Sequence, residues 1–143
     1  MAKPETTHSD YFHFCDIPTR WEDNDQYGHV NNIIYLSFFD TAVNTYLIGE
    51  HALNLLHGDI IGYVVETNCK YFSPLAFPEI VTAGLRVNRI GETSVTFGVS
   101  LFSEKNKETP AAEGIFTHVY VDRKTERPVK IPKNLRQALE SLH

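Results

Sequence analysis

The segment from residue 31 to about residue 48 has a helical period with an unusually wide apolar face. At about 100° per residue its apolar side chains cover roughly 180° of the circumference, and they are Tyr35, Leu36, Phe38, Phe39, Ala42, Val43, Tyr46 and Leu47. A surface helix with one neighbour has a narrower apolar stripe. We therefore expect a helix enclosed by something concave, with Asn31 or Asn32 as its N-cap and Gly49 just after its end.

Most of the remaining chain has the pattern of strands. Alternating or β-branched runs predict strands over residues 11–17, 60–72, 80–88, 93–102 and 111–121. Short connections make the last three antiparallel neighbours. Residues 50–59 are expected to be irregular, with a helical turn at 52–56, and a short helix is expected over 134–142. The sequence therefore predicts an α+β fold, in which a five- or six-stranded antiparallel sheet wraps one long central helix.

Length and composition restrict the domain count and the partners. The 143 residues fit a single domain, expected over 11–143, after a polar and flexible tail at 1–10. A net charge of −5 disfavours nucleic acid as a partner, and no apolar run is long enough to span a membrane. The two cysteines, Cys15 and Cys69, fall inside strand patterns and make no disulfide framework, so we expect core positions and a cytoplasmic location.

The catalytic motifs of several large enzyme classes are absent, but one polar segment precedes the helix. The chain has no GxxxxGK phosphate loop, no GxSxG serine nucleophile and no HExxH zinc motif. The segment reads Asp23-x-Asp25-x-x-Gly28-His29-Val30-Asn31-Asn32-x-x-Tyr35. A calcium loop is excluded, because Ile34 falls where the bidentate glutamate is needed and no helix enters the loop.

Two interpretations of this segment remain. Its polar groups could satisfy only turn and helix-cap donors, which is the favoured interpretation for Asn31 or Asn32 taken alone. Alternatively, a carboxylate beside the unpaired N–H groups and positive dipole of a helix N-terminus could serve acyl transfer. The N–H groups would bind the developing oxyanion while the carboxylate attacks or activates water.

The run Arg20-Trp21-x-Asp23-x-Asp25-x-x-Gly28-His29-Val30-Asn31-Asn32-x-x-Tyr35 resembles hot-dog thioesterases of the 4-hydroxybenzoyl-CoA thioesterase type. It is most similar to the acyl-CoA branch with the signature DxDxxGHVNNxxY. The likeness continues through Ile61-Gly62 to Ile131-Pro132 near the end. It implies a hot-dog fold, hydrolysis of acyl-CoA to a carboxylic acid and coenzyme A, no cofactor or metal, and a homodimer or homotetramer with sites at the interface. An edge strand left unpaired by a single sheet independently favours such pairing.

The resemblance also assigns residues. Asp25 matches the catalytic nucleophile or general base, and the backbone N–H of Asn32 matches the donor to the thioester carbonyl. His29 and Asn31 match polar positions lining the site, His29 as a catalytic candidate, while Asp23 is expected to be structural. Tyr35 completes the motif as a substrate-binding candidate, although the aromatic helix face is expected to be mainly core.

Two points stay open on the sequence alone. The HVNN element also resembles plant acyl-ACP thioesterases, and a non-catalytic thioester-binding module or a hot-dog dehydratase could share the fold. Residues 86–143 carry ten basic and seven acidic side chains, so the phosphates of coenzyme A are expected near basic groups there. The candidates are Arg86, Arg89, Lys130, Arg123 and Lys124.

Overall fold

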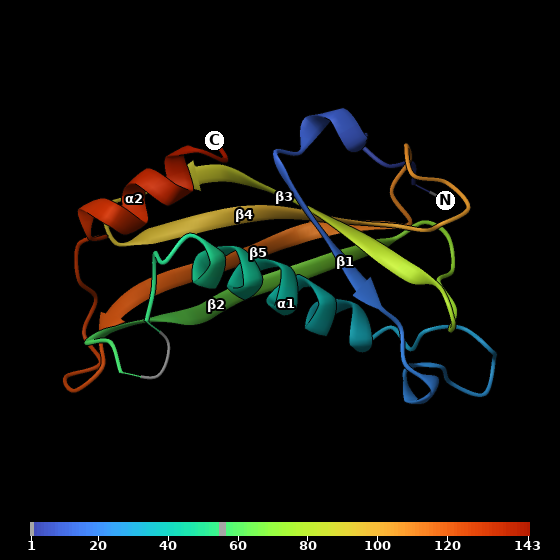
Figure 1. The fold of residues 1–143 in the computed structure, drawn as a ribbon, viewed down its shortest axis with the longest axis horizontal. Coiled ribbons are helices and arrows are strands. Elements are labelled where there is room, and N and C mark those ends of the chain that lie inside the picture. Colours follow the sequence, from blue (N-terminus) through green and yellow to red (C-terminus); the bar gives the residue numbers. More distant parts are fainter. Residues whose placement is uncertain (1, 55–56) are drawn as a thin grey trace.

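The computed structural model describes residues 2–54 and 57–143, and in it a curved antiparallel sheet packs on one long helix (Figure 1). The strands are β1 (His13–Pro18), β2 (Ile60–Tyr71), β3 (Ile80–Ile90), β4 (Ser94–Phe102) and β5 (Ala112–Asp122), and the helices are α1 (Ile34–Gly49) and α2 (Lys133–Glu140). The sheet order is β1-β3-β4-β5-β2, with every pair antiparallel. The predicted α+β architecture is confirmed, with five strands.

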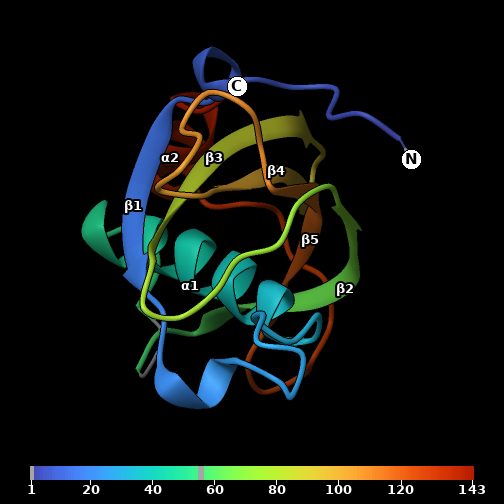
Figure 2. The same ribbon diagram turned by 90° about the vertical axis from the view of Figure 1, so that its right-hand side faces the viewer.

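The wide apolar face of α1 is explained by the curvature of the sheet. Figure 2 shows the sheet bending around the helix, and α1 contacts β1, β2, β3 and β4. Phe39, Val43 and Leu47 on the helix are fully buried, as are Leu85 and Phe97 on the sheet. Burial on more than one side is the reason that apolar side chains occupy half of the helix circumference.

Both ends of α1 differ from the prediction. The helix begins at Ile34, and no side chain caps it. The Asn31 side chain instead accepts a hydrogen bond from the Ile33 N–H (3.2 Å), and the Asn31 carbonyl accepts one from Ile34 N–H (2.9 Å), so a turn precedes the helix. At the other end Gly49 is the last helical residue, and His51 has the left-handed conformation (φ 53°).

The other element boundaries move by one or two residues. β1 begins at His13 because Tyr11 turns onto the outer face of the sheet, where its ring lies over Gly84. The terminal helix begins at Lys133 and ends at Glu140. The helical turn predicted at 52–56 lies partly outside the described residues, which omit 55 and 56.

The N-terminal segment, residues 5–11, crosses the outer face of the sheet. The Glu5 N–H donates to Glu113 Oε1 (2.9 Å), the Thr6 hydroxyl donates to Glu113 Oε2 (2.8 Å), and the His8 N–H donates to the Glu108 carbonyl (3.0 Å). The Thr6 and Tyr11 hydroxyls of this segment also bond to the Ser100 hydroxyl on β4, which explains why Ser100 is buried although it faces outward. The flexibility predicted for residues 1–10 stays a prediction, and residues 5–8 of that stretch are anchored.

The two cysteines lie in strands, as predicted. Cys15 on β1 and Cys69 on β2 are free thiols, half-buried and packed against the core. Burial raises the pKa of both thiols, that of Cys69 to about 11. In the described part of the chain, none of the helices has the length and apolarity required to cross a membrane.

Candidate active site

Asp23 holds the two ends of the motif segment together. Its side chain is buried, with 1% of the residue exposed. Its carboxylate accepts hydrogen bonds from the Arg20 backbone N–H (2.8 Å) and from the Arg20 guanidinium (2.9 and 3.1 Å). The Asp23 carbonyl accepts a bond from the Asn31 N–H (2.8 Å). With its oxygens engaged in this way, Asp23 fits the structural role expected for it.

Asp25 begins a tight turn and is held differently. Its N–H donates to the His29 carbonyl (2.9 Å), and its carbonyl accepts from the Gly28 N–H (3.1 Å). Gly28 has φ +82°, a left-handed conformation that favours glycine. Asp25 Oδ1 accepts from the Tyr27 N–H (2.9 Å), while Oδ2 has no hydrogen-bond donor among the described residues. One oxygen therefore fixes the carboxylate and the other remains available to a substrate or water.

Hydrogen bonds join the motif segment, on both sides of this turn, to the connection that follows β2. The Val30 N–H donates to the Leu75 carbonyl (2.7 Å), and the Phe77 N–H donates to Asn24 Oδ1 (3.0 Å). The Asn32 carbonyl accepts from the Tyr71 hydroxyl (3.0 Å), but within the described chain the Asn32 N–H has no acceptor. An unpaired N–H just before a helix is a donor for developing negative charge.

These groups meet at an open pocket of about 410 Å³. It is lined by Asp25, His29, Val30, Asn32, Tyr35, Tyr71, Phe72, Ser73 and Pro74. The structure thus brings together four of the residues predicted for the site, namely Asp25, His29, Asn32 and Tyr35. Asn31 does not line it, because its side chain turns back to the Ile33 N–H.

Two tyrosines form the side of the pocket next to the helix. Tyr35 is buried, and its hydroxyl accepts a hydrogen bond from the Leu75 N–H (3.3 Å). The Tyr71 ring lies edge-on to it, with 4.9 Å between centroids. Desolvation raises the pKa of Tyr71 to about 12, so its hydroxyl keeps the proton that it donates to Asn32. Sequence reasoning missed Tyr71, whose only signal is an aromatic residue at the end of a long strand.

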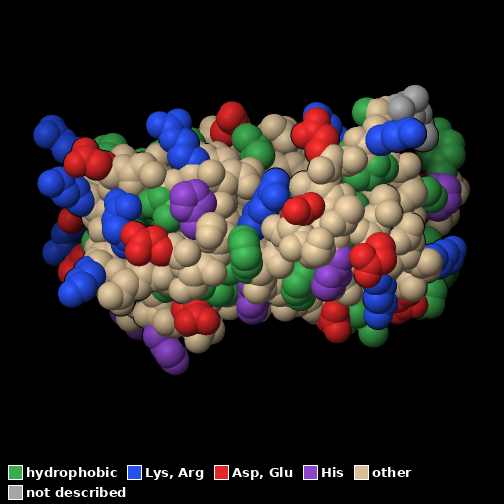
Figure 3. Space-filling model, turned by 90° about the horizontal axis from the view of Figure 1, so that it is seen from above, with side chains coloured by type: hydrophobic (Ala, Val, Ile, Leu, Met, Phe, Trp, Pro, Cys, Tyr) green, Lys and Arg blue, Asp and Glu red, His purple; other side chains and the backbone are tan. Residues whose placement is uncertain are grey.

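The basic candidates are not near this pocket within one chain. The motif segment bonds to residues 75–77, just before β3 begins, whereas Arg89 lies at the other end of β3. Lys130 is at that distant end too, because the next residue, Ile131, bonds to Glu92 in the β3–β4 connection. Figure 3 shows Lys and Arg side chains gathered at this end. Arg86 lies on the outer face, with its guanidinium over the Tyr11 ring (5.3 Å).

Comparison with known proteins gives a consistent set of relatives. The sequence model of the thioesterase-like superfamily matches residues 19–139 of this chain. The crystal structure of the PA5185 protein from Pseudomonas aeruginosa is 51% identical, with a TM-score of 0.93 over 98% of this chain and 97% of that one. The fold is also that of Slr0204, a 1,4-dihydroxy-2-naphthoyl-CoA thioesterase from Synechocystis, at 17% identity and a TM-score of 0.80 over 90% of this chain and 96% of that one.

A curated relative extends the comparison to plants. The chloroplastic acyl-acyl carrier protein thioesterase ATL3 from Arabidopsis thaliana is 27% identical over 127 residues, which are 87% of this chain. The chain spans 66% of the length of that relative. The family match covers most of the chain, and the curved sheet wraps the long helix (Figure 2). The chain therefore belongs to the thioesterase-like superfamily and has its hot-dog fold.

Proposed function

We propose that this protein hydrolyses acyl-CoA thioesters to a free carboxylic acid and coenzyme A. The observation that carries the proposal is the pairing in one pocket of two groups, the Asp25 carboxylate and the Asn32 N–H. Among the described residues, one oxygen of the carboxylate has no donor and the N–H has no acceptor. A carboxylate beside such a donor has the two functions that acyl transfer to water requires. The relatives named thioesterases support the reaction class.

Two chemical routes use the same residues. In the first, Asp25 attacks the carbonyl carbon, the thiolate of coenzyme A leaves, and water then hydrolyses the mixed anhydride. In the second, Asp25 takes a proton from a water that attacks directly, and the departing thiolate receives a proton. Negative charge develops on the thioester oxygen in both, and the Asn32 N–H at the positive end of α1 would stabilise it.

The remaining pocket residues would orient the acyl thioester. His29 is exposed at the rim and offers a ring nitrogen to the substrate, and Tyr35 and Tyr71 supply an aromatic wall. Asn31 does not line the pocket, and its side-chain oxygen is engaged with the Ile33 N–H, so its proposed binding role rests on the side-chain amide nitrogen alone.

We also propose a homodimer or homotetramer. The sheet has two edges, β1 and β2, and the β2 edge exposes Tyr63, Val64 and Val65. Apolar side chains on a long unpaired edge favour pairing with another strand. Arg89 and Lys130 lie at the opposite end of the sheet from Asp25. They could therefore contact the phosphates of coenzyme A only if a second subunit placed its own Arg89 and Lys130 beside the pocket.

The main alternative to this proposal is a substrate whose acyl group is held by acyl carrier protein instead of coenzyme A. The plant relative ATL3 is named as a thioesterase of acyl groups held by acyl carrier protein. A panel of acyl groups, each supplied on coenzyme A and on acyl carrier protein, would be assayed by release of free thiol. We expect higher kcat/KM on coenzyme A. A preference for the protein carrier would overturn the choice of carrier, and no turnover on either would favour a non-catalytic thioester-binding module.

A further inference from the structure

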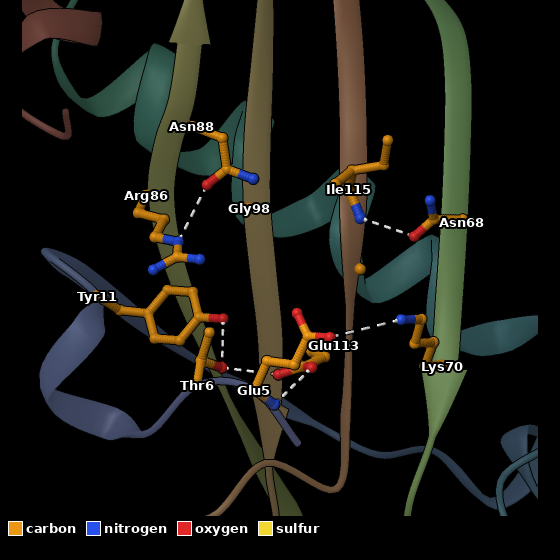
Figure 4. A pocket seen from close by; sticks show the side chains of 11 residues that line it. Glu5, Thr6, Tyr11, Asn68, Lys70, Arg86, Asn88, Gly98, Glu113 and Ile115 are labelled. Carbon is orange, nitrogen blue, oxygen red and sulfur yellow. Dashed lines mark hydrogen bonds and ion pairs between the residues drawn. The ribbon is translucent and has the colours of Figure 1, made fainter. Parts of the chain in front are cut away.

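A second polar pocket, of about 200 Å³, lies on the outer face of the sheet (Figure 4). The N-terminal segment and side chains from β2, β3 and β5 surround it, and it shares no residue with the Asp25 pocket. Figure 2 shows α1 packed on the inner face of the sheet, so the outer pocket lies on the opposite side of the sheet from α1. The lining residues are Glu5, Thr6, Tyr11, Asn68, Lys70, Arg86, Asn88, Gly98, Glu113, Gly114 and Ile115.

The buried carboxylate of this pocket is already satisfied. Glu113, with 8% of the residue exposed, accepts the Glu5 N–H at one oxygen and the Thr6 hydroxyl at the other. The Thr6 oxygen in turn lies 2.9 Å from the Tyr11 hydroxyl, which also bonds to Ser100. This chain of hydroxyls ends on Glu113 and ties the N-terminal segment to the sheet. Glu113 therefore needs no donor from a ligand.

The other half of the pocket holds donors without acceptors. Arg86 Nε donates to Asn88 Oδ1 (3.0 Å), and the Ile115 N–H donates to Asn68 Oδ1 (3.2 Å). These bonds occupy both amide oxygens and leave both amide NH₂ groups and the terminal guanidinium nitrogens of Arg86 with no acceptor in the described residues. Figure 4 shows Arg86, Asn88 and Asn68 in this half, with the Glu5 and Glu113 carboxylates in the other.

Gly98 makes room for the bonded pair of the donor half. A Cβ atom at this position would lie 2.7 Å from Asn88 Oδ1 and 3.1 Å from Arg86 Nε. The absence of a side chain on β4 thus allows the bonded pair from β3 to lie flat across the neighbouring strand. Any larger residue would displace that pair and change the position of the donors.

We propose that this outer pocket binds a small anion through a carboxylate or phosphate group held by the free ends of the Arg86–Asn88 pair, the terminal guanidinium nitrogens and the amide NH₂ group. The Arg86 guanidinium would supply the charge and the Asn88 NH₂ group a further hydrogen bond, an arrangement suited to oxyanions. Asn68 lies two strands from Gly98, on the far side of the pocket. The Lys70 ammonium lies 4.0 Å from the Glu5 carboxylate and offsets part of the negative charge in the acidic half. A volume of about 200 Å³ equals that of about six or seven water molecules, so it admits a small metabolite or one phosphate of a larger molecule.

The test is a titration of the 143-residue chain at constant ionic strength, monitored by the amide signals in NMR spectra. Inorganic phosphate and acetate are the probes for the two anion types, and coenzyme A tests whether a nucleotide phosphate is the source. We expect saturable shifts of the Gly98 and Ile115 amides with a millimolar or lower Kd. Displacement of phosphate by coenzyme A at the same amides would identify the nucleotide as the ligand, and no displacement would identify a free small anion.

Variants make the assignment specific. Arg86→Gln should weaken binding by about tenfold or more, as expected for a lost charge-assisted hydrogen bond. Asn68→Ala should weaken it less, and Gly98→Ala should also reduce it. Arg127→Gln, which removes the same charge from an exposed position outside the pocket, should bind as wild type. If the shifts map only to Gly28 and Asn32, or if Arg127→Gln matches Arg86→Gln, the proposal is wrong.

Discussion

Asp23 and Asp25 are two residues apart but have different surroundings. Asp23 is buried and bonded to Arg20 on both oxygens. Asp25 is half-buried, lines the pocket and has one oxygen without a donor in the part of the chain that the structure describes. Residues two apart would share one face of an extended strand, but the backbone turns here, because a short 3₁₀ helix ends at Asp23 and a tight turn begins at Asp25. The structure therefore separates the anchoring carboxylate from the one proposed to react.

Substitution of Asp25 tests its proposed role directly. Asp25→Asn retains the size and the acceptor for the Tyr27 N–H but removes the negative charge and the basicity. We expect kcat to fall by about 10² to 10⁴-fold, the usual range for lost general-base catalysis. Binding of an unreactive substrate analogue should change far less, because the oxyanion donor at Asn32 belongs to the backbone. Steady-state kinetics and calorimetric binding would measure the two effects.

The matched control is Asp23→Asn. It should lower the free energy of unfolding by about 1–3 kcal/mol, since it weakens charge-assisted bonds to Arg20, while its effect on kcat should be smaller than that of Asp25→Asn. A folded Asp25→Asn protein with wild-type kcat would rule out the proposed mechanism. A larger kinetic loss in Asp23→Asn would reverse the assignment within the motif.

Tyr71 is a positioning residue in this scheme, because its hydroxyl holds the carbonyl of the residue that offers the free N–H. Tyr71→Phe keeps the ring contact with Tyr35 and removes that bond. A lost neutral hydrogen bond is worth about 1 kcal/mol, so kcat should fall by about fivefold with little change in KM. Faster hydrogen exchange at Asn32 should accompany the loss. Unchanged kcat and exchange would show that the bond does not position Asn32.

Among the elements, β5 carries a buried titratable group. His118 is 3% exposed and lies among the rings of Phe97, Phe116 and Tyr120, with its Nδ1 3.4 Å from the Tyr120 hydroxyl. A Cβ at Gly62 on β2 would lie 2.9 Å from the same ring nitrogen. Desolvation lowers the pKa of His118 to about 4, so the imidazole is neutral in the folded protein at neutral pH.

This shift predicts how stability depends on pH. The unfolded chain, with a histidine pKa of about 6.5, binds the proton first as the pH falls. The stability from this group is therefore fully present above pH 6.5 and is lost between about pH 6.5 and 4, by about 3 kcal/mol in all. Urea unfolding across this range should show a steeper loss for wild type than for His118→Gln. Parallel pH profiles would contradict the assignment.

The sequence predicted elements better than it predicted their ends and contacts. The wide apolar face of α1 and the alternation along β3 and β4 follow from burial by a curved sheet, so they were legible as patterns. The start of α1 was not, because the Asn31 side chain bonds to a turn instead of capping the helix. The places of Tyr71 in the pocket and of Arg86 on the outer face depend on which strand ends and faces come together. Tertiary packing decides this, so local sequence patterns do not show it.

At the scale of the whole molecule, the exposed β2 edge predicts association. Light scattering at micromolar concentration should give at least twice the 16.3 kDa of one chain. Val65→Lys places a charge on that edge, where Val65 is 58% exposed, and should shift the protein toward monomer and reduce kcat/KM. The control Phe12→Lys changes an exposed apolar residue that lies outside the strands. A stable wild-type monomer with full activity would exclude a shared site.

The turn at Gly28 has a consequence for how the chain tolerates change. Gly28 and Gly49 both have space around them, since a Cβ at either would meet no atom within 4 Å. Yet Gly28 is held at φ +82° by the turn that presents Asp25, whereas Gly49 is an ordinary helical residue. A saturation library selected for turnover should therefore reject nearly every side chain at position 28 and accept most at position 49, where alanine would improve the helix. Free space around a residue therefore does not predict tolerance to substitution where the backbone conformation requires glycine.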